Sequence, residues 1–220
     1  MHKIITIFLL TTILLTTNTA KASDYGAHYS WNEDDQILLS YISNNKKRLI
    51  SYLINSYDKS KSYRAEIERI FMTEGIPLEL IALAAIESNF SPNAVSHAGA
   101  VGMWQFMPAT GSEIGLKIST TIDERRNWKK STLAAAKYLK YLSEVHFDDN
   151  YELAILAYNA GLGNVKRAIK KNKTTDPWIL IQDTSSFKKE SRDYLPRVIS
   201  AIHIFDFIDK QQQNQIAKKD

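Results

Sequence analysis

No cysteine occurs among the 220 residues of the chain. Disulfide bonds are therefore excluded, and a folded domain must be stabilised by its hydrophobic core. The same absence removes the lipid-modified cysteine that follows the signal of a bacterial lipoprotein, so we expect no lipid anchor of that type. Any attachment to a membrane would have to use an apolar segment of the chain.

No apolar run is long enough for a comfortable membrane span. The first apolar segment, Ile4 to Leu15, is short and contains several threonines. It follows the basic start Met1-His2-Lys3 and precedes Ala20-Lys21-Ala22, which is typical of a cleavage site. We therefore predict a signal peptide over residues 1–22 and an exported protein, in the periplasm or at the cell wall, with no stable membrane anchor after cleavage. An uncleaved N-terminal anchor is the alternative.

A strong charge of one sign is also missing. The chain has 28 Lys and Arg against 24 Asp and Glu, and its formal net charge is +4. Loss of Lys3 and Lys21 with the signal would lower that charge further, which is not typical of nucleic-acid-binding proteins. The five histidines are scattered without the spacing of a zinc site. We therefore expect no nucleic-acid partner, no metal and no other cofactor.

Apolar residues recur with the three- and four-residue spacing of helices, and the sequence shows no alternating strand pattern and no internal repeat. This spacing predicts an all-α fold with helices over residues 37–42, 49–53, 67–71, 77–87, 131–145, 151–160, 165–171 and from 196 onward. Asn44-Asn45 is expected to interrupt the first two. Ser131 and Pro196 are expected to begin their helices, and Gly75 and Gly161 to follow helix ends.

Residues 91–121 lack sustained periodicity and hold four of the eight glycines. We expect a long, structured loop with short helical turns, and loops of this length in compact domains are usually functional. The chain then divides into an N-terminal helical extension over residues 23–62, a main domain over 63–208 and a polar tail over 209–220.

Glu87 ends an almost wholly apolar run that follows Pro77, and only Glu79 within that run is polar. A helix that is apolar on nearly every face belongs in a core, and its C-terminal end carries the negative end of the helix dipole. Burial and the dipole both raise the pKa of a carboxyl group. Glu87 is therefore a candidate general acid, partly protonated near neutral pH. The alternative is an ordinary glutamate that reaches solvent or pairs with an arginine.

Three patches combine aromatic rings with amide or hydroxyl groups beside glycine or the helix end. They are ESNF (87–90), GAVGMWQFMPATG (99–111) and AYNAG (157–161). Rings can stack on sugar faces while amides bind hydroxyl and acetamido groups, so the patches indicate a glycan-binding cleft. Each patch also has a structural alternative. Trp104 and Phe106 could be core residues, Gly161 a helix cap, and Tyr158-Asn159 a helix end.

Taken together, the motifs resemble the catalytic (SLT) domain of lytic transglycosylases in the goose-lysozyme-like superfamily. The membrane-bound lytic murein transglycosylase D type is the most similar. The resemblance covers about residues 63–204. Its blocks, in the family's order, are GIPLELIALAAIESNFSPNAVSHAGAVGMWQFMPATG, IDERRNW, AILAYNAGLGNVKRAI and KESRDYLPRVIS. It implies a goose-type, lysozyme-like fold: a single helical catalytic domain over 63–208 with a catalytic cleft.

The resemblance also assigns the site. It implies that Glu87 is the sole catalytic acid/base and that no metal takes part. The implied substrate-binding residues are Ser88, Trp104, Gln105, Tyr158, Asn159, Glu190 and Tyr194. We interpret Asp123 and Glu124 as structural partners of Arg125 or Arg126.

The implied activity is that of a peptidoglycan lytic transglycosylase. Such an enzyme cleaves the β-1,4 bond between N-acetylmuramic acid and N-acetylglucosamine and leaves a 1,6-anhydromuramic acid end. The expected partner is the glycan strand of peptidoglycan, and the expected state is a monomer. Two alternatives stay open: a goose-type lysozyme that hydrolyses the same bond with water, and an inactive cell-wall-binding module.

Overall fold

The computed structural model describes residues 36–218, and within that range all extended regular structure is helical. The prediction of an all-α fold is confirmed. In chain order the elements are α2 (Gln36–Ser60), α3 (Arg64–Glu74), η1 (Leu78–Ile81), α4 (Ala82–Ser88), α5 (Pro108–Glu113), η2 (Glu124–Arg126), α6 (Trp128–Lys140), η3 (Tyr141–Val145), α7 (Tyr151–Ala160), α8 (Leu162–Asn172), α9 (Pro177–Leu180) and α10 (Lys189–Ile216). The predicted signal peptide lies outside the described residues. No helix within 36–218 has both the length and the apolar character that a bilayer crossing requires.

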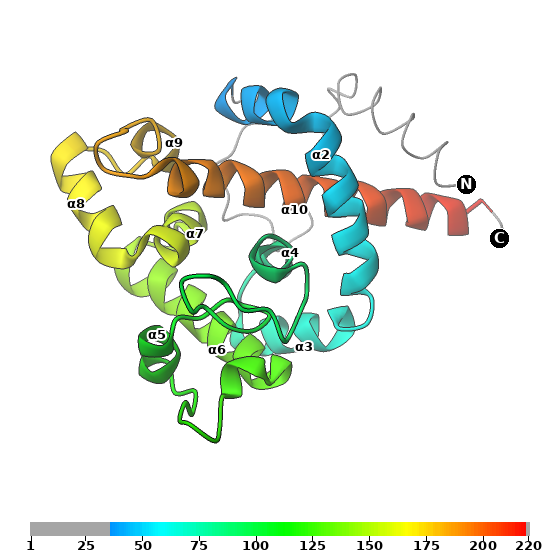
Figure 1. The fold of residues 1–220 in the computed structure, drawn as a ribbon. Helices are drawn as coiled ribbons and strands as arrows, with labels where there is room; N and C mark the ends of the chain where they lie inside the picture. The colour runs from blue at the N-terminus through cyan, green and yellow to red at the C-terminus, as the bar shows by residue number, and fades with distance from the viewer. Residues whose placement is uncertain (1–35, 219–220) are drawn as a thin grey trace.

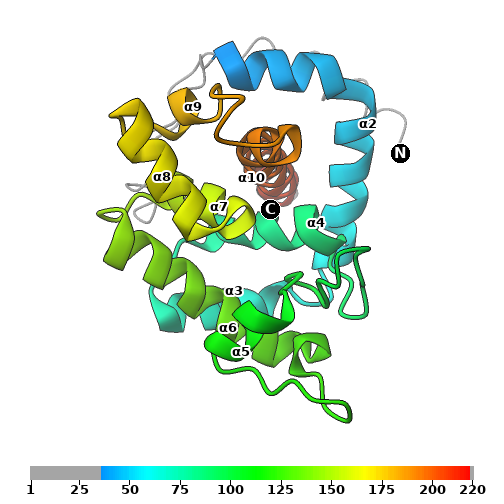
Figure 2. The same cartoon turned by 60° about the vertical axis from the view of Figure 1, so that its left-hand side comes forward.

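Helix α10 lies at the centre of the fold. Figure 2 views it nearly along its axis, with α2, α4 and α7 arranged around it, and all three contact it. Its buried side chains recur with helical spacing and include Leu195, Val198, Ile199 and Ile202. Because α10 touches both α2 and α4, side chains on its first turns can meet the end of α4.

The predicted start of α10 at Pro196 is wrong. The helix begins at Lys189, and Pro196 lies inside it, buried. A proline inside a helix removes one backbone hydrogen bond. Tyr194 and Leu195 are also buried, so the helical turn before the proline is held by its packing into the core. Tertiary burial therefore outweighs the local preference of proline for a first helical position.

The predicted cap of α6 is also wrong. Ser131 is fully buried within the helix, and Asn127 is the N-cap residue. The side-chain oxygen of Asn127 accepts a hydrogen bond from the backbone N–H of Lys130 at 3.1 Å. Asparagine caps as well as serine does, so the four residues before Ser131 contained an equally good start signal.

Helix α2 does not stop at Asn44-Asn45 as predicted, but it bends strongly along its course (Figures 1 and 2). The Asn45 side-chain amide donates to the backbone carbonyl of Tyr41 at 2.9 Å. Such side-chain bonds compete with the helical hydrogen-bond ladder. The far part of α2 adds Leu53 and Tyr57 to the common core, so the predicted extension packs with the main domain.

The apolar run after Pro77 forms two pieces: the 3-10 turn η1 and then α4. Its buried residues extend from Leu80 to Ile86, as expected for a helix that is apolar on nearly every face. Gly75 ends α3 in the left-handed conformation, with φ 72°, which confirms its predicted role as a helix cap. The end of α3 at Gly75 and the buried run through η1 place α4 inside the core, with its last turn at the surface.

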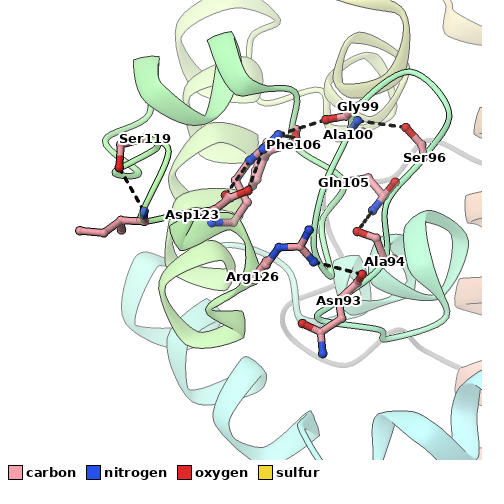
Figure 3. A network of polar contacts seen from close by, with 12 residues as sticks. Asn93, Ala94, Ser96, Gly99, Ala100, Gln105, Phe106, Ser119, Asp123 and Arg126 are labelled. Carbon is pink, nitrogen blue, oxygen red and sulfur yellow. Dashed lines mark hydrogen bonds and ion pairs between the residues drawn. The ribbon is translucent and has the colours of Figure 1, made fainter.

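The segment between α4 and α6 has the predicted irregular course, interrupted by the short helix α5. The buried side chain of Arg125 bonds two points of this segment. Its Nη1 donates to the backbone carbonyls of Gly99 at 3.1 Å and Phe106 at 3.0 Å. These two partners are labelled in Figure 3. A guanidinium carries five N–H donors in one plane, so a single side chain can fix two distant points of the loop.

Asp123 pairs with Arg125 as predicted, with 2.8 Å between Oδ2 and Nη2. Glu124 also has the predicted structural role, but its partner is not an arginine: its carboxylate bonds Lys130 Nζ and accepts the backbone N–H of Lys117 at 2.8 Å. Both carboxylates are thus occupied by structural bonds.

Candidate active site

Glu87 lies in the last turn of α4, which confirms its predicted place at the end of an apolar helix. The five preceding residues of α4 are all buried, whereas Glu87 itself keeps partial exposure to solvent. Asn89 and Phe90 follow with left-handed backbones, φ 55° and 58°, and turn the chain away. The carboxyl group therefore sits where the core meets the surface.

Tyr194 of α10 binds this carboxyl directly. Its hydroxyl donates a hydrogen bond to Glu87 Oε1 across 107 residues of sequence. The tyrosine ring is 3% exposed, so the bond is made from inside the core. Since Tyr194 occupies Oε1, Oε2 is the oxygen that remains for another partner. The structure thus brings together two residues that the resemblance assigned to one site.

The pKa of Glu87 is raised from 4.5 to about 7. Burial of the carboxyl is the main cause, because it disfavours the charged form. The Tyr194 hydrogen bond and the positive charge of Arg197 act in the opposite direction, and the charge of Glu190 adds a small further increase in pKa. A group with this pKa is about half protonated at neutral pH, so it can both give and take a proton there.

Tyr158 lies beside this pair. Its hydroxyl donates to the backbone carbonyl of Trp104 at 2.7 Å, and its ring packs against Phe106 with 5.7 Å between centroids. Burial raises the pKa of the Tyr158 hydroxyl well above its ordinary value, and the charge of Glu87 raises it further. Tyr158 is therefore a neutral hydrogen-bonding group near Glu87 that also joins α7 to the loop.

Ser88 and Gln105 bond the backbone of the same loop. The Ser88 hydroxyl donates to the carbonyl of Met103 at 2.8 Å and accepts the N–H of Ser91 at 3.0 Å. The Gln105 amide donates to the carbonyl of Gly102 at 2.8 Å, and its own backbone is left-handed, with φ 49°. Both side chains are partly exposed; Ser88 ties the loop to the end of α4, whereas the Gln105 bond lies within the loop.

The side chain of Trp104 lies in the core, so its predicted role in binding substrate needs correction. Its side chain is fully buried, packs against Phe71 at 5.8 Å and donates its Nε1 hydrogen to Thr132 Oγ1 at 2.9 Å. A ring with no exposed surface cannot stack on a sugar. The structural alternative, a core residue, describes the side chain of Trp104, and its backbone carbonyl is the part that reaches Tyr158.

Asn159 and Glu190 complete the set of predicted residues. Asn159 follows Tyr158 in the last turn of α7 and is partly exposed. Glu190 is exposed in the first turn of α10, one helical turn before Tyr194. The charge of Glu190 acts on Glu87, so the two carboxyl groups belong to one electrostatic neighbourhood.

The prediction missed Arg197 and Tyr52. Arg197 follows Tyr194 by three residues on α10, which puts both on one helix face, and this spacing could have identified it. Tyr52 of α2 donates its hydroxyl to the carbonyl of Ala85 at 2.6 Å, 33 residues away. No local pattern marks Tyr52, because its partner belongs to another helix.

Within residues 36–218, no group of three or more His, Cys, Asp or Glu side chains gathers in a way that could hold a metal ion. A single carboxyl group, half protonated and flanked by neutral tyrosines, can transfer protons.

The chain has a lysozyme-like fold. In fold it is similar to the 70 kDa soluble lytic transglycosylase of Escherichia coli, with a TM-score of 0.57 over 78% of this chain and 30% of that one, at 20% identity. The model of the transglycosylase SLT domain family matches residues 67–181. The chain belongs to this family. Glu190, Tyr194 and Arg197 lie beyond the matched residues.

Other relatives have higher identity to this chain. The chain is 36% identical over 154 residues to membrane-bound lytic murein transglycosylase D of Escherichia coli K12, covering 68% of this chain and 33% of that protein. It is 38% identical over 120 residues to a putative tributyltin chloride resistance protein of an Alteromonas species, covering 51% and 58%. A solved glutamate-to-glutamine inactive mutant of lytic transglycosylase Slt from Pseudomonas aeruginosa is 29% identical, with a TM-score of 0.56 over 69% of this chain and 24% of that one. The chain thus spans about a third of the length of the Escherichia coli relative.

Proposed function

We propose that the protein is a peptidoglycan lytic transglycosylase that uses Glu87 as its acid/base. The observation that carries this proposal is the partly exposed Glu87 carboxyl at the end of a buried helix, with Oε1 bound by Tyr194 and its pKa raised to about 7. Family membership supports the same activity. So does the solved relative, which a glutamate-to-glutamine change leaves inactive.

In the first step, protonated Glu87 donates its proton to the oxygen that bridges N-acetylmuramic acid and N-acetylglucosamine. The bond from this oxygen to the anomeric carbon breaks, and the N-acetylglucosamine part leaves as an alcohol. Positive charge develops on the muramoyl ring, and the substrate's own acetamido group stabilises it. Burial favours the first step because it keeps Glu87 protonated near neutral pH.

In the second step, Glu87 is a carboxylate and acts as a base. It accepts the proton of the muramoyl 6-hydroxyl while that oxygen bonds to the anomeric carbon, which closes the 1,6-anhydro ring. Glu87 ends protonated, ready for another cycle, and no water is consumed. The Tyr194 hydrogen bond stabilises the carboxylate form of Glu87 that exists between the two steps.

Hydrolysis by a lysozyme-type reaction is the second candidate. Two-carboxylate glycosidases need a second acidic group to activate water or to act as the nucleophile. Glu190 is the acidic residue whose charge acts on Glu87, which is the observation in favour of this candidate. Because Glu190 is exposed in the first turn of α10, hydrolysis is the less favoured of the two reactions.

The products separate the two reactions. Digestion of purified peptidoglycan by the protein is expected to release muropeptides with anhydromuramic acid ends, each lighter by one water than a hydrolysed end. Mass spectrometry before and after borohydride reduction checks this result, because anhydro ends are not reduced. Reducible muramic acid ends in place of anhydro ends would contradict the transglycosylase proposal and favour hydrolysis. If neither product forms, the protein would be an inactive cell-wall-binding module.

The pH dependence tests the position of the proton. Glu87 must begin protonated, so kcat/KM is expected to fall about tenfold per pH unit above a pH of about 7. Tyr194→Phe removes a hydrogen bond that lowers the pKa of Glu87, so this limb should move to higher pH. Initial rates across pH 5 to about 10 measure both effects. A limb that stays in place in the variant would show that Tyr194 does not control the Glu87 proton.

We also propose the location and layout predicted from the sequence. The protein would be exported through cleavage of residues 1–22 and would act as a monomer on glycan strands in the periplasm or at the cell wall.

The catalytic domain would span residues 63–208. Two contacts support including the flanking segments in its packing unit. Asp209 of the predicted tail accepts Arg64 Nη1 at 3.0 Å, and Tyr57 of the predicted extension stacks edge-on against Phe205 at 5.3 Å.

A further inference from the structure

The second half of α2 is hydrogen-bonded to the end of α4. Tyr52 donates its hydroxyl hydrogen to the carbonyl of Ala85 at 2.6 Å, just before Glu87 in the chain. Ser56, one helical turn further along α2, donates to Asn89 Oδ1 at 2.6 Å, just after Glu87. The two helices contact each other in this region (Figure 2). Glu87 is thus flanked in the chain by two residues that α2 binds.

The turn that follows Glu87 has an unfavourable backbone conformation. Asn89 and Phe90 both have left-handed φ angles, 55° and 58°. Asparagine tolerates this conformation, but a bulky residue such as phenylalanine adopts it rarely. Strained residues of this kind persist only where the surrounding structure determines their conformation, and they cluster at active sites. Contacts from other segments must therefore hold this turn.

Those contacts come from α2 and α10. The Asn89 side chain is bonded through both of its polar atoms, because Oδ1 accepts the Ser56 hydroxyl and Nδ2 donates to Asn55 Oδ1 at 3.3 Å. Ser56 is fully buried, so water does not compete for its hydroxyl. Phe90 is 2% exposed, and its ring stacks on Phe205 of α10 with 6.4 Å between centroids. Each of the two strained residues is therefore fixed by a different helix.

The position of the Glu87 carboxyl depends on this turn. Glu87 lies in the last turn of a helix of only seven residues, and helix ends fray. The Ala85 carbonyl that Tyr52 binds also accepts the backbone N–H of Asn89 at 3.0 Å, so both bonds from α2 act on the same turn. Proton transfer needs the two heavy atoms within about 2.6 to 3.2 Å of each other. A misplacement of about 1 Å can lower a rate about 100-fold.

We propose that Tyr52 and Ser56 are positioning residues for the catalytic carboxyl. They hold the last turn of α4 and the turn after it, so that Glu87 stays in place against Tyr194 and the substrate. The inference rests on the proposed function for the reaction that Glu87 carries out. Helix α2 precedes residues 67–181, which the family model matches, so part of the active-site support comes from outside the matched segment.

Ser56→Ala tests this role, because it removes the bond to Asn89 with the loss of a single oxygen atom. On soluble glycan strands, kcat per mole of folded protein should fall about 10- to 100-fold. KM should stay the same, because the bond places the acid and does not bind substrate. Ser60→Ala is the matched control. Ser60 is also a fully buried serine of α2, but its hydroxyl donates to the Tyr57 carbonyl of its own helix at 2.6 Å, so kcat should not change.

Tyr52→Phe removes the other bond from α2 and keeps the ring. It should also lower kcat and leave KM unchanged, since the Ala85 carbonyl is part of the backbone and does not touch substrate. The folded fraction of each variant, measured by denaturant unfolding, corrects kcat for any loss of stability. A rise in KM at constant kcat would overturn the positioning role of Tyr52.

Asn89→Gly separates the bond from the shape of the turn. Glycine adopts the left-handed conformation without strain, but it lacks the side chain that Ser56 binds. Asn89→Gly should lower kcat about as much as Ser56→Ala, and the double variant should lose no more than either single variant, because all three lack the same bond.

Three results would overturn the inference: full activity of Ser56→Ala per mole of folded protein, an equal loss in Ser60→Ala, or losses that multiply in the double variant. The product assay on the unmutated chain tests the proposed reaction separately. If the unmutated chain forms anhydro ends and Ser56→Ala is as active, only the positioning role fails. If the unmutated chain forms none, the proposed function fails before any variant is compared.

Discussion

Glu87→Gln is expected to lower the rate of glycan cleavage by about a hundred- to ten-thousandfold, the usual contribution of a general acid–base group. The amide keeps the shape of the side chain and can still accept the Tyr194 hydrogen bond, but it cannot donate and then recover a proton. Turnover of purified glycan strands, followed by chromatography of the products, measures the loss. Glu144→Gln makes the same chemical change at an exposed glutamate of η3 and should keep its activity.

The same variant should be more stable than the unmutated protein at high pH. The pKa of Glu87 is 4.5 in the reference state and about 7 in the fold, so between these values the unfolded chain ionises while the folded chain does not. Ionisation therefore lowers stability progressively as pH rises from 4.5 through 7, by about 1 to 3 kcal/mol. Glutamine does not ionise, so the stability of the variant does not fall in this way.

Denaturant unfolding of both proteins at pH 4 and pH 8 checks this difference. Equal stability changes at the two pH values would show that the pKa of Glu87 is not raised. If Glu87→Gln kept more than about a tenth of the activity, another group would have to supply the proton. The stability result and the activity result thus test the environment and the role of Glu87 separately.

Gly102→Ala is expected to destabilise the fold by about 2 to 5 kcal/mol and to lower activity with it. Gly102 has φ 87°, a conformation that disfavours any side chain, and an added Cβ would lie 1.9 Å from the carbonyl oxygen of Arg125. Neither backbone can move easily, because Arg125 is itself held by Asp123 and the loop. The adjacent Met103 carbonyl accepts the Ser88 hydroxyl, so a shifted loop would disturb the residue next to Glu87.

Gly99→Ala is the matched control. Gly99 has the same φ of 87°, but nothing lies within 4 Å of its added Cβ. Its cost should be limited to backbone strain, about 1 to 2 kcal/mol. Thermal or denaturant unfolding of both variants measures the difference, which isolates the contact with Arg125. Equal destabilisation of the two variants would show that the close approach of Gly102 to Arg125 is not important for stability.

Sequence patterns alone predicted the local features of the protein correctly. Helical periodicity established an all-α fold, the glycine after α3 marked its end, and a carboxylate after an apolar run identified Glu87. Each depends on residues within one or two helical turns, where spacing and propensity act directly. The family motifs could be recognised for the same reason, because each is a short continuous block.

Helix ends were predicted less well. Asn127 and Ser131 are both good caps, and only the burial of Ser131 decides between them. Pro196 favours a helix start, yet α10 continues backward through Tyr194 because that turn packs into the core. In both cases two local signals competed, and contacts with other segments determined which one prevailed.

The chemistry of the site was decided by tertiary structure. Tyr194 reaches Glu87 across 107 residues, and Tyr52 reaches the same helix from 33 residues away. The ring of Trp104 is buried rather than placed in the cleft because α3 and α6 cover it, through Phe71 and Thr132. Burial and distance are properties of segments packed together, so a pKa of about 7 at Glu87 depends on the fold even though the residue itself could be identified from the sequence.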